Sequence, residues 1–215
     1  MDPSDLALPG LIHDLNNVFQ TLMEAADALG GDPRWTGVSA AMFRSIERAR
    51  EITWSMQASD QPAAPFETVL FNARMLIEDS MMSRRGQKIR FISDVEPALV
   101  LRNAWSWERV LINLFCNAVE AMPHGGTISV RARRMKEGIH IVIADEGCGI
   151  PPELLPLIFD PHVSTKRSGG LGLHIVHSIV EQEAGEVRAA NRGGRGAEFT
   201  ITIPAEPVLS RGVSA

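Results

Sequence analysis

The chain has 215 residues, of which 45% are hydrophobic and 22% are charged. This length and composition favour a chain that buries a real core over a disordered one, and they allow one domain of ordinary size together with a small helical module. With 21 Lys and Arg residues against 26 Asp and Glu residues, the net charge of −5 provides no overall attraction for nucleic acid or for an anionic membrane.

Two amphipathic helices are predicted near the N-terminus, at residues 11–29 and 35–57. Apolar side chains in the first helix recur at alternating steps of four and three, as one packed helix face requires. They are Leu11, Leu15, Val18, Leu22, Ala25 and Leu29. Glycines and a proline at residues 30–33 end this helix. Because a hairpin with so wide an apolar stripe lacks partner surface within its own chain, we predict a homodimer in which residues 1–60 form a four-helix bundle.

A second domain is predicted at residues 66–204, between a proline-containing linker at 58–65 and a C-terminal tail at 205–215. Its helices are expected at residues 66–83, 106–122, 151–158 and 171–183. Its strands are expected at residues 88–95, 98–102, 127–134, 138–144, 185–190 and 198–203. The last four strands flank short turns and form two hairpins. The predicted fold class is therefore α+β, a helical hairpin followed by an α/β sandwich.

The long helix predicted at 106–122 carries a first candidate binding element. Asn113 and Asn117 are one helical turn apart, so their amides project from the same face. A neutral amide oxygen suits a Mg²⁺ ion that already carries phosphate oxygens, because hard cations prefer oxygen ligands. Asn117 is the candidate metal ligand and Asn113 its support, while polar decoration of the helix face is the alternative interpretation.

A second candidate follows the strand predicted at 138–144. Asp145 closes this strand, and Gly147 and Gly149 allow the chain to turn sharply before Ile150, so that a flat ligand can approach the backbone. A carboxylate at this position accepts a hydrogen bond from an exocyclic amine such as that of adenine, which guanine does not offer in the same place. A purely structural turn is the alternative here.

A third candidate opens the helix predicted at 171–183. Glycine N–H groups and the positive end of the helix favour phosphate binding there, and a lysine just upstream adds local positive charge. The expected nucleotide-binding positions are Lys166, Gly170, Leu171, Gly172 and Leu173. A Gly-x-Gly alone is weak evidence, so the order and spacing of the three candidates carry more weight than any one of them.

Four segments together resemble the N, G1, F and G2 boxes of sensor histidine kinases, in the family order. They are residues 113–121 (Asn-Leu-Phe-Cys-Asn-Ala-Val-Glu-Ala), 145–150 (Asp-Glu-Gly-Cys-Gly-Ile), 159–161 (Phe-Asp-Pro) and 170–173 (Gly-Leu-Gly-Leu). The resemblance implies the Bergerat ATP-binding fold rather than a P-loop. In the family, the residue matching Asn117 coordinates Mg²⁺, the one matching Asp145 binds the adenine amine, and the segment matching 151–170 is a lid over ATP. Lys166 would contact phosphate.

His13 is the candidate phosphoryl acceptor. At about 100° per residue, the apolar face of the first helix centres near Leu15 and places His13 roughly 160° away, toward solvent. A neutral imidazole can attack phosphorus, and the Asp14 carboxylate can accept the other ring proton and hold the required tautomer. Asn17 lies one turn beyond His13. An ordinary solvated surface histidine is the alternative interpretation.

Residues 13–17 (His-Asp-Leu-Asn-Asn) resemble the H box of the same family. There the histidine is autophosphorylated, the next acid acts as base, and the polar residue four positions on assists dephosphorylation of a partner. Many members have proline where this chain has Val18, a change that removes a helix kink and no reactive group. The resemblance implies a two-component histidine kinase that passes phosphate from His13 to an aspartate of a response regulator receiver domain, with phosphatase activity on that regulator as an additional expectation.

The sequence leaves two alternatives open. A dimeric histidine phosphotransferase relays phosphate between receiver domains without ATP, but such proteins are expected to have eroded nucleotide boxes, whereas Asn117 and Asp145 are present here. A serine kinase acting on an anti-sigma antagonist shares the ATP fold but lacks the hairpin predicted at 11–57.

Cysteine usage and hydropathy indicate the compartment and the input. Cys116 and Cys148 form no CxxC pair, which suits a reducing environment. No run approaches the roughly 18 apolar residues of a membrane span, and residues 1–3 lack the basic region of a signal peptide. We therefore expect a cytoplasmic protein without membrane insertion. Residues 1–10 leave no room for a sensory domain, so the signal is expected from a separate sensor protein or from a longer form of the chain.

Overall fold

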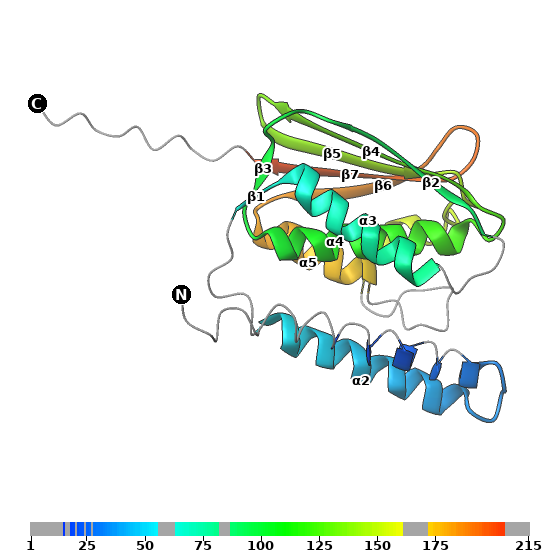
Figure 1. The fold of residues 1–215 in the computed structure, drawn as a ribbon. Coiled ribbons are helices and arrows are strands. Elements are labelled where there is room, and N and C mark those ends of the chain that lie inside the picture. Colours follow the sequence, from blue (N-terminus) through cyan, green and yellow to red (C-terminus); the bar gives the residue numbers. More distant parts are fainter. Residues whose placement is uncertain are drawn as a thin grey trace, which may run out of the picture. The chain divides into compact units, whose positions relative to one another are not determined.

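The computed structural model describes residues 15, 18–19, 21–23, 25–26, 28–55, 63–81, 87–160 and 172–204. The chain divides into two compact units, one comprising Met1–Gln61 and Asp160–Leu171 and the other Pro62–Phe159 and Gly172–Ala215. In Figure 1 the helical segments of the first unit are blue, and the second unit runs from cyan to red. Within the described part of the chain, no helix combines the length and the apolar character that a bilayer span requires.

The first unit contains the helix α2, Thr36–Ser55, which confirms the helix predicted at 35–57. Every described residue between positions 15 and 30 is helical as well. Ser39 is only 2% exposed, and its Oγ donates a hydrogen bond of 2.6 Å to the carbonyl oxygen of Ala26. This bond joins the two helical segments on either side of the turn between them.

The apolar stripe predicted for the first helix is largely exposed within a single chain. Val18 is 53% exposed and Leu22 is 40% exposed, while Phe19 and Ala26, at the edge of the stripe, are buried. Beside Leu22 lies a hollow of about 330 Å³, with α2 side chains on its other walls. Its lining residues are Leu22, Val38, Ala41, Met42, Ser45 and Ile46. One hairpin therefore leaves much of its apolar surface uncovered.

The second unit is a five-stranded mixed sheet with three helices on one face (Figure 1), which confirms the predicted α/β sandwich. In spatial order the strands are β2 (Ile89–Val95), β4 (Gly126–Met135), β5 (Gly138–Asp145), β7 (Ala197–Pro204) and β6 (Glu186–Asn191). Only β2 and β4 pair in parallel, and the other neighbours are antiparallel. The helices are α3 (Phe66–Met81), α4 (Ala104–Ala121) and α5 (Gly172–Gln182). Both predicted hairpins, β4 with β5 and β6 with β7, are confirmed.

The core lies between the sheet and these helices. Strand side chains alternate between the two faces, and in β7 the inward set is Ala197, Phe199, Ile201 and Ile203. From α4, Trp107 and Phe115 are 1% and 0% exposed. Each buried side chain of this size stabilises the fold by about 1.5–3 kcal/mol relative to leaving it in water. The face of α4 that carries Asn117 is thus fixed by the packing of the opposite face.

Both ends of α4 are held by side chains from distant parts of the unit. Asn103, at the N-cap with a φ of 51°, donates a hydrogen bond from its side chain to Glu183, just beyond α5. At the other end, Nε2 of Gln87 donates to the carbonyl oxygens of Val119 and Met122, at 2.7 and 3.0 Å. Carbonyls at a helix C-terminus have no partner within the helix, so Gln87 stabilises the end of α4 that lies nearest the candidate site.

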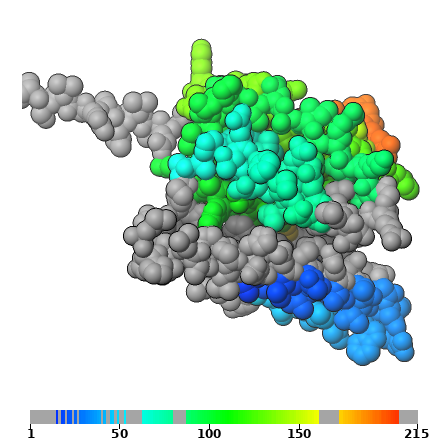
Figure 2. Space-filling view, viewed as in Figure 1, coloured from blue at the N-terminus to red at the C-terminus, as the bar shows by residue number. Residues whose placement is uncertain are grey.

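The helix α3 packs on α4. Asn72 donates a hydrogen bond of 2.6 Å to Oε1 of Glu108. Burial raises the pKa of the Glu108 carboxyl above its ordinary value, and the bond from Asn72 opposes that rise. The outer side of α3 remains in solvent, where Phe71 is 61% exposed, and Figure 2 shows this helix in cyan at the surface of the unit.

A small second ladder was not predicted. The two-residue strand β1, Ala64–Pro65, pairs antiparallel with β3, Val100–Leu101. The end of the predicted linker is therefore paired, and β3 is shorter than the strand predicted at 98–102. Ala98 has a φ of 60°, which breaks the extended conformation on one side of β3. The pairing depends on residues far apart in sequence, which local patterns do not reveal.

The helix predicted at 151–158 is wrong except for a short 3₁₀ turn, Leu155–Leu157. Pro156 has no N–H to donate to the carbonyl four residues earlier, so an α-helix cannot run through this position. The backbone N–H of Leu154 instead bonds the carbonyl oxygen of Pro151 at 2.9 Å, as in a turn.

Candidate nucleotide-binding site

Asp145 ends β5, as the sequence predicts, and is 4% exposed. Its Oδ1 accepts hydrogen bonds from the backbone N–H of Gly147 at 2.7 Å and from that of Ala197 at 3.2 Å. Two fixed donors on one oxygen set the orientation of the carboxylate. Among the described residues the hydrogen bonds to this carboxylate both fall on Oδ1, so Oδ2 is available to a donor on a ligand.

The loop after Asp145 packs closely against the C-terminal end of α4. The N–H of Cys148 donates to the carbonyl oxygen of Ala121 at 3.2 Å. A Cβ added to Gly147 would lie 2.6 Å from the Cβ of Ala121, and Gly149 has a φ of 78°. Both positions therefore require glycine. The first and second sequence candidates are thus neighbours in the fold.

The start of α5 lies against the middle of α4. A Cβ added to Gly172 would lie 2.9 Å from Oδ1 of Asn113. Asn113 also donates from Nδ2 to the carbonyl oxygen of Arg109 at 2.8 Å, so its amide is turned toward its own helix. Asn117 follows one turn later and is half-buried, as is Leu173 on α5. The third candidate therefore adjoins the first on a shared helix face.

Several predicted site residues lie outside the described part of the chain. They are His13, Asp14, Asn17, Lys166, Gly170 and Leu171. The structure assigns no geometry to these positions. The predicted residues that it does bring together are Asn113, Asn117, Asp145, Gly147, Gly149, Ile150, Gly172 and Leu173.

Part of the expected lid segment, 151–170, contacts α5. Phe159 lies within this segment, and the carbonyl oxygen of Phe159 lies 3.1 Å from Nδ1 of His174 on α5. The ring of His177, one turn further along α5, lies 5.5 Å from the Phe159 ring between centroids. These contacts hold Phe159 on the helix that begins at Gly172, so the residues flanking 160–171 belong to one packed unit.

Sequence reasoning missed the contribution of the loop between β6 and β7. Asn191 forms two hydrogen bonds with the main chain of Ile150, and Arg192 donates from Nη1 to the carbonyl oxygen of Asp145 at 3.0 Å. In the sequence these residues are only the first part of a glycine-rich hairpin turn. These contacts join residues that are 41 and 47 positions apart in the sequence, so no local sequence pattern indicates them.

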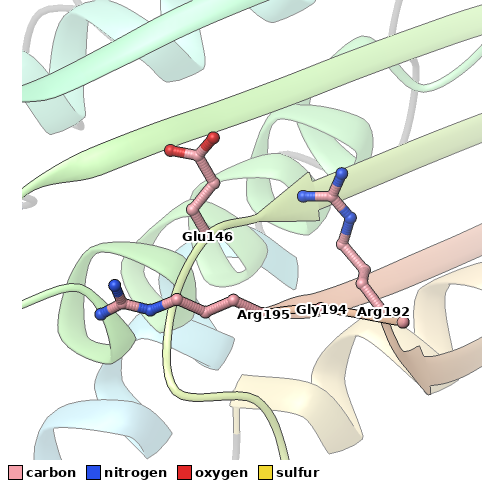
Figure 3. Close-up of a pocket in the computed structure, with 5 residues that line it drawn as sticks. Glu146, Arg192, Gly194 and Arg195 are labelled. Carbon is pink, nitrogen blue, oxygen red and sulfur yellow. The ribbon is translucent and has the colours of Figure 1, made fainter.

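A hollow of about 390 Å³ lies beside this loop. Its lining residues are Glu146, Arg192, Gly193, Gly194 and Arg195. In Figure 3 the side chains of Arg192 and Arg195 extend in different directions, and the Glu146 side chain points away from Gly194. Oε2 of Glu146 accepts a hydrogen bond from the N–H of Thr127 at 2.9 Å. Because none of the predicted nucleotide-binding residues lines this hollow, we do not assign the nucleotide to it.

Gly196 provides a direct test of the contact between the β6–β7 loop and Asp145. It has a φ of 93°, and an added Cβ would lie 1.9 Å from the carbonyl oxygen of Asp145. We expect Gly196→Ala to lower the free energy of unfolding by at least about 3 kcal/mol, because a backbone clash is added to a strained φ. Chemical denaturation followed by circular dichroism measures this.

Gly193→Ala in the same loop is the matched control. A Cβ there would meet no atom within 4 Å, so its effect on unfolding should stay within about 1 kcal/mol. Equal stability of the two variants would contradict the close approach of Gly196 to Asp145.

Comparison with known proteins gives a consistent result. Residues 104–207 match the family described as histidine kinase-, DNA gyrase B- and HSP90-like ATPases. The sensor histidine kinase ZraS of Escherichia coli strain K12 is 35% identical over 209 residues, which cover 91% of this chain and 44% of ZraS. The sensory histidine kinase/phosphatase NtrB of Salmonella typhimurium is 27% identical over 212 residues, covering 91% of this chain and 60% of NtrB.

A solved structure shows the same fold. The mycobacterial sensor histidine kinase MprB superposes with a TM-score of 0.59 and 26% identity, over 69% of this chain and 99% of the MprB chain. The present chain spans about half the length of the curated relatives, 44% of ZraS and 60% of NtrB. The similarity therefore concerns the shared part of those longer proteins.

Proposed function

Because this chain is a histidine kinase transmitter core with an ATP-binding domain, we propose that it phosphorylates itself on His13 with ATP and passes the phosphoryl group to an aspartate of a response regulator. The observation that carries this proposal is the buried carboxylate of Asp145. Its Oδ1 is held by two backbone donors and its Oδ2 is left for a ligand. The loop that follows touches the end of α4.

The residues of the site fit an adenine nucleotide. Oδ2 of Asp145 accepts a hydrogen bond from the adenine amine, whereas the carbonyl of guanine would place two acceptors together. Gly147 and Gly149 let the segment after Asp145 pack closely against Ala121 and Asn191, which keeps it beside the carboxylate that receives the base. The N-terminus of α5 at Gly172 and Leu173, with Gly170, Leu171 and Lys166 upstream, holds the phosphates.

The magnesium ion is part of this proposal, with Asn117 as its protein ligand. When bound, Mg²⁺ neutralises negative charge on the phosphate oxygens. An amide oxygen suits this position because most of the remaining ligands would be phosphate oxygens and water. Asn113 supports Asn117 from the preceding turn of α4.

The chemical step follows from the exposed histidine predicted on the first helix. A neutral ring nitrogen of His13 attacks the γ-phosphorus, and the bond from that phosphorus to the bridging oxygen breaks as ADP leaves. Asp14 accepts the proton from the other ring nitrogen. In the second step the P–N bond breaks as an aspartate oxygen of the receiver takes the phosphoryl group.

The assembly that we propose is a homodimer formed through the N-terminal helices. Val18, Leu22 and Val38 are 53%, 40% and 47% exposed in one chain, and the adjoining hollow is mainly apolar. A second copy would cover this stripe, at a gain of roughly 25 cal/mol per Å² of apolar surface removed from water. Residues 1–60 are thus proposed as the dimerisation and phosphotransfer module, and 66–204 as the ATP-binding domain.

Further parts of the proposal concern partners and location. Asn17, at the position that assists dephosphorylation in the family, supports phosphatase activity on the response regulator, and NtrB is named a kinase/phosphatase. The signal would come from a separate sensor protein or from a longer form of the chain. We place the protein in the cytoplasm, where a response regulator and ATP are both present.

The test is incubation with ATP labelled at the γ-phosphate and Mg²⁺. We expect label on the protein that is lost in acid and stable in base, as a phosphohistidine requires. ATP labelled at the α-phosphate should leave no label, and chelation of Mg²⁺ should abolish the reaction. Purified receiver domains should then remove the label from the protein. If no label forms with any partner while a phosphorylated receiver does label His13, the protein is a relay phosphotransferase instead.

A further inference from the structure

The hairpin of β6 and β7 holds the candidate adenine-binding segment, residues 145–150, at its far end through Asn191, the last residue of β6. Oδ1 of Asn191 accepts a hydrogen bond from the N–H of Ile150 at 2.7 Å, and Nδ2 of Asn191 donates to the carbonyl oxygen of Ile150 at 2.6 Å. One side-chain amide thus satisfies both backbone groups of one residue, as a neighbouring peptide group does in a sheet. A Cβ on Gly149 would lie 2.9 Å from Oδ1 of Asn191, so the contact extends along the segment.

The near end of the segment is held by the same hairpin. Arg192 donates to the carbonyl oxygen of Asp145 at 3.0 Å, and the N–H of Ala197 donates to Oδ1 of Asp145 at 3.2 Å. The loop is itself closed by a bond of 3.0 Å from the N–H of Arg192 to the carbonyl oxygen of Gly196. Both ends of the segment are therefore fixed to one hairpin.

The bonds from this hairpin matter because the middle of the segment 145–150 has little conformational restraint of its own. Gly147 and Gly149 have wide conformational freedom, and ordering such residues costs more entropy than ordering other types. A segment that is ordered before the ligand arrives binds more tightly, since the ordering does not have to accompany binding.

We propose that Asn191 and Arg192 are positioning residues for nucleotide binding, which hold residues 145–150 in the shape that presents Asp145 to the adenine amine. The proposal rests on the ATP-binding function proposed above. Asn191 itself is exposed. Its removal should therefore loosen the segment without unfolding the domain.

The experiment compares Asn191→Ala, Asn191→Asp and Arg192→Ala in the full chain. The Asn191→Asp side chain still accepts the hydrogen bond from the N–H of Ile150, but its second carboxylate oxygen faces the carbonyl oxygen of Ile150 and repels it. We therefore expect Asn191→Asp to bind ADP at least as weakly as Asn191→Ala. We expect the Kd of ADP to rise about tenfold in both, the scale of one or two lost hydrogen bonds. Arg192→Ala should show a smaller rise. KM for ATP should follow Kd while kcat at saturating ATP stays nearly unchanged.

Arg195→Ala is the matched control, because Arg195 lies in the same loop and the structure gives it no bond to residues 145–150 among the described contacts. Its Kd should match that of the wild type. All variants should melt within about 2 °C of the wild type, since exposed polar substitutions usually change stability little. Unchanged Kd in both Asn191 variants, or an equal loss in Arg195→Ala, would overturn the proposal.

Amide hydrogen exchange in the nucleotide-free chain separates this inference from the proposed function. The N–H groups of Gly149 and Ile150 should exchange faster in Asn191→Ala than in the wild type, whether or not ATP is the ligand. A wild-type chain that binds no nucleotide would reject the ATP-binding function. Unchanged exchange at Ile150 would reject the positioning role by itself.

Discussion

Asn in place of Asp145 is expected to lower the affinity for ATP at least about a hundredfold. Oδ1 of Asp145 receives the backbone N–H groups of Gly147 and Ala197. The amide oxygen of an asparagine must take that place, because the amide nitrogen would face two donors. Its NH₂ group then occupies the position of Oδ2 and points a donor at the adenine amine. A buried donor facing a donor loses the hydrogen bond and leaves both groups unsatisfied, which supports a loss of this size.

Calorimetric titration with ADP and with ATP measures this loss, and thermal unfolding shows whether the fold is kept. Glu137→Gln is the control, since Glu137 is an exposed acidic residue in the turn between β4 and β5. It should bind nucleotide as the wild type does. Normal binding by Asp145→Asn, or an equal loss in Glu137→Gln, would show that the base is recognised elsewhere.

Removal of the imidazole in His13→Ala is expected to abolish the acid-labile label completely. The acceptor nitrogen is then absent, while the nucleotide site on the second unit is untouched, so ADP affinity should be unchanged. His140→Ala is the control, because His140 lies on β5 in the sheet and should retain full labelling. Label that persists in His13→Ala would place the phosphoryl group on another residue.

Mixing His13→Ala with Asp145→Asn extends this test. One variant keeps the ATP site and the other keeps the acceptor, so label can appear only if the phosphoryl group passes between the two chains of a dimer. Label on the Asp145→Asn chain would show transfer between chains. Its absence, with each variant dimeric and folded, would show transfer within one chain.

The sequence allowed the individual elements of the second unit to be predicted because their patterns are local. On both sides of the turn at residues 136–137, apolar residues recur in the pattern of paired strands. In α4, from Ala104 to Ala121, they recur with the period of a helix. Asp145 falls at the end of β5 because the glycine-rich segment cannot continue a strand. Each of these features is determined by residues that lie a few positions apart in the sequence.

The partners that complete the site could not be predicted in the same way. Ala197 and Asn191 reach residues 145–150 only after β7 has paired with β5, and this pairing joins positions more than fifty apart. The short ladder of β1 with β3 and the cap from Gln87 to the end of α4 are also non-local. Local apolar patterns specify which face of an element is buried, but they do not specify which distant polar group bonds a given carbonyl.

The donor from Ala197 determines when the site can exist during synthesis. Every nucleotide box emerges from the ribosome before β7 does, yet the Asp145 carboxylate gains its second backbone donor only when β7 joins the sheet. A nascent chain that ends before this strand has all the motifs and an incomplete site. Nucleotide capture would therefore mark a finished domain, and bound nucleotide would in turn favour the fully paired sheet.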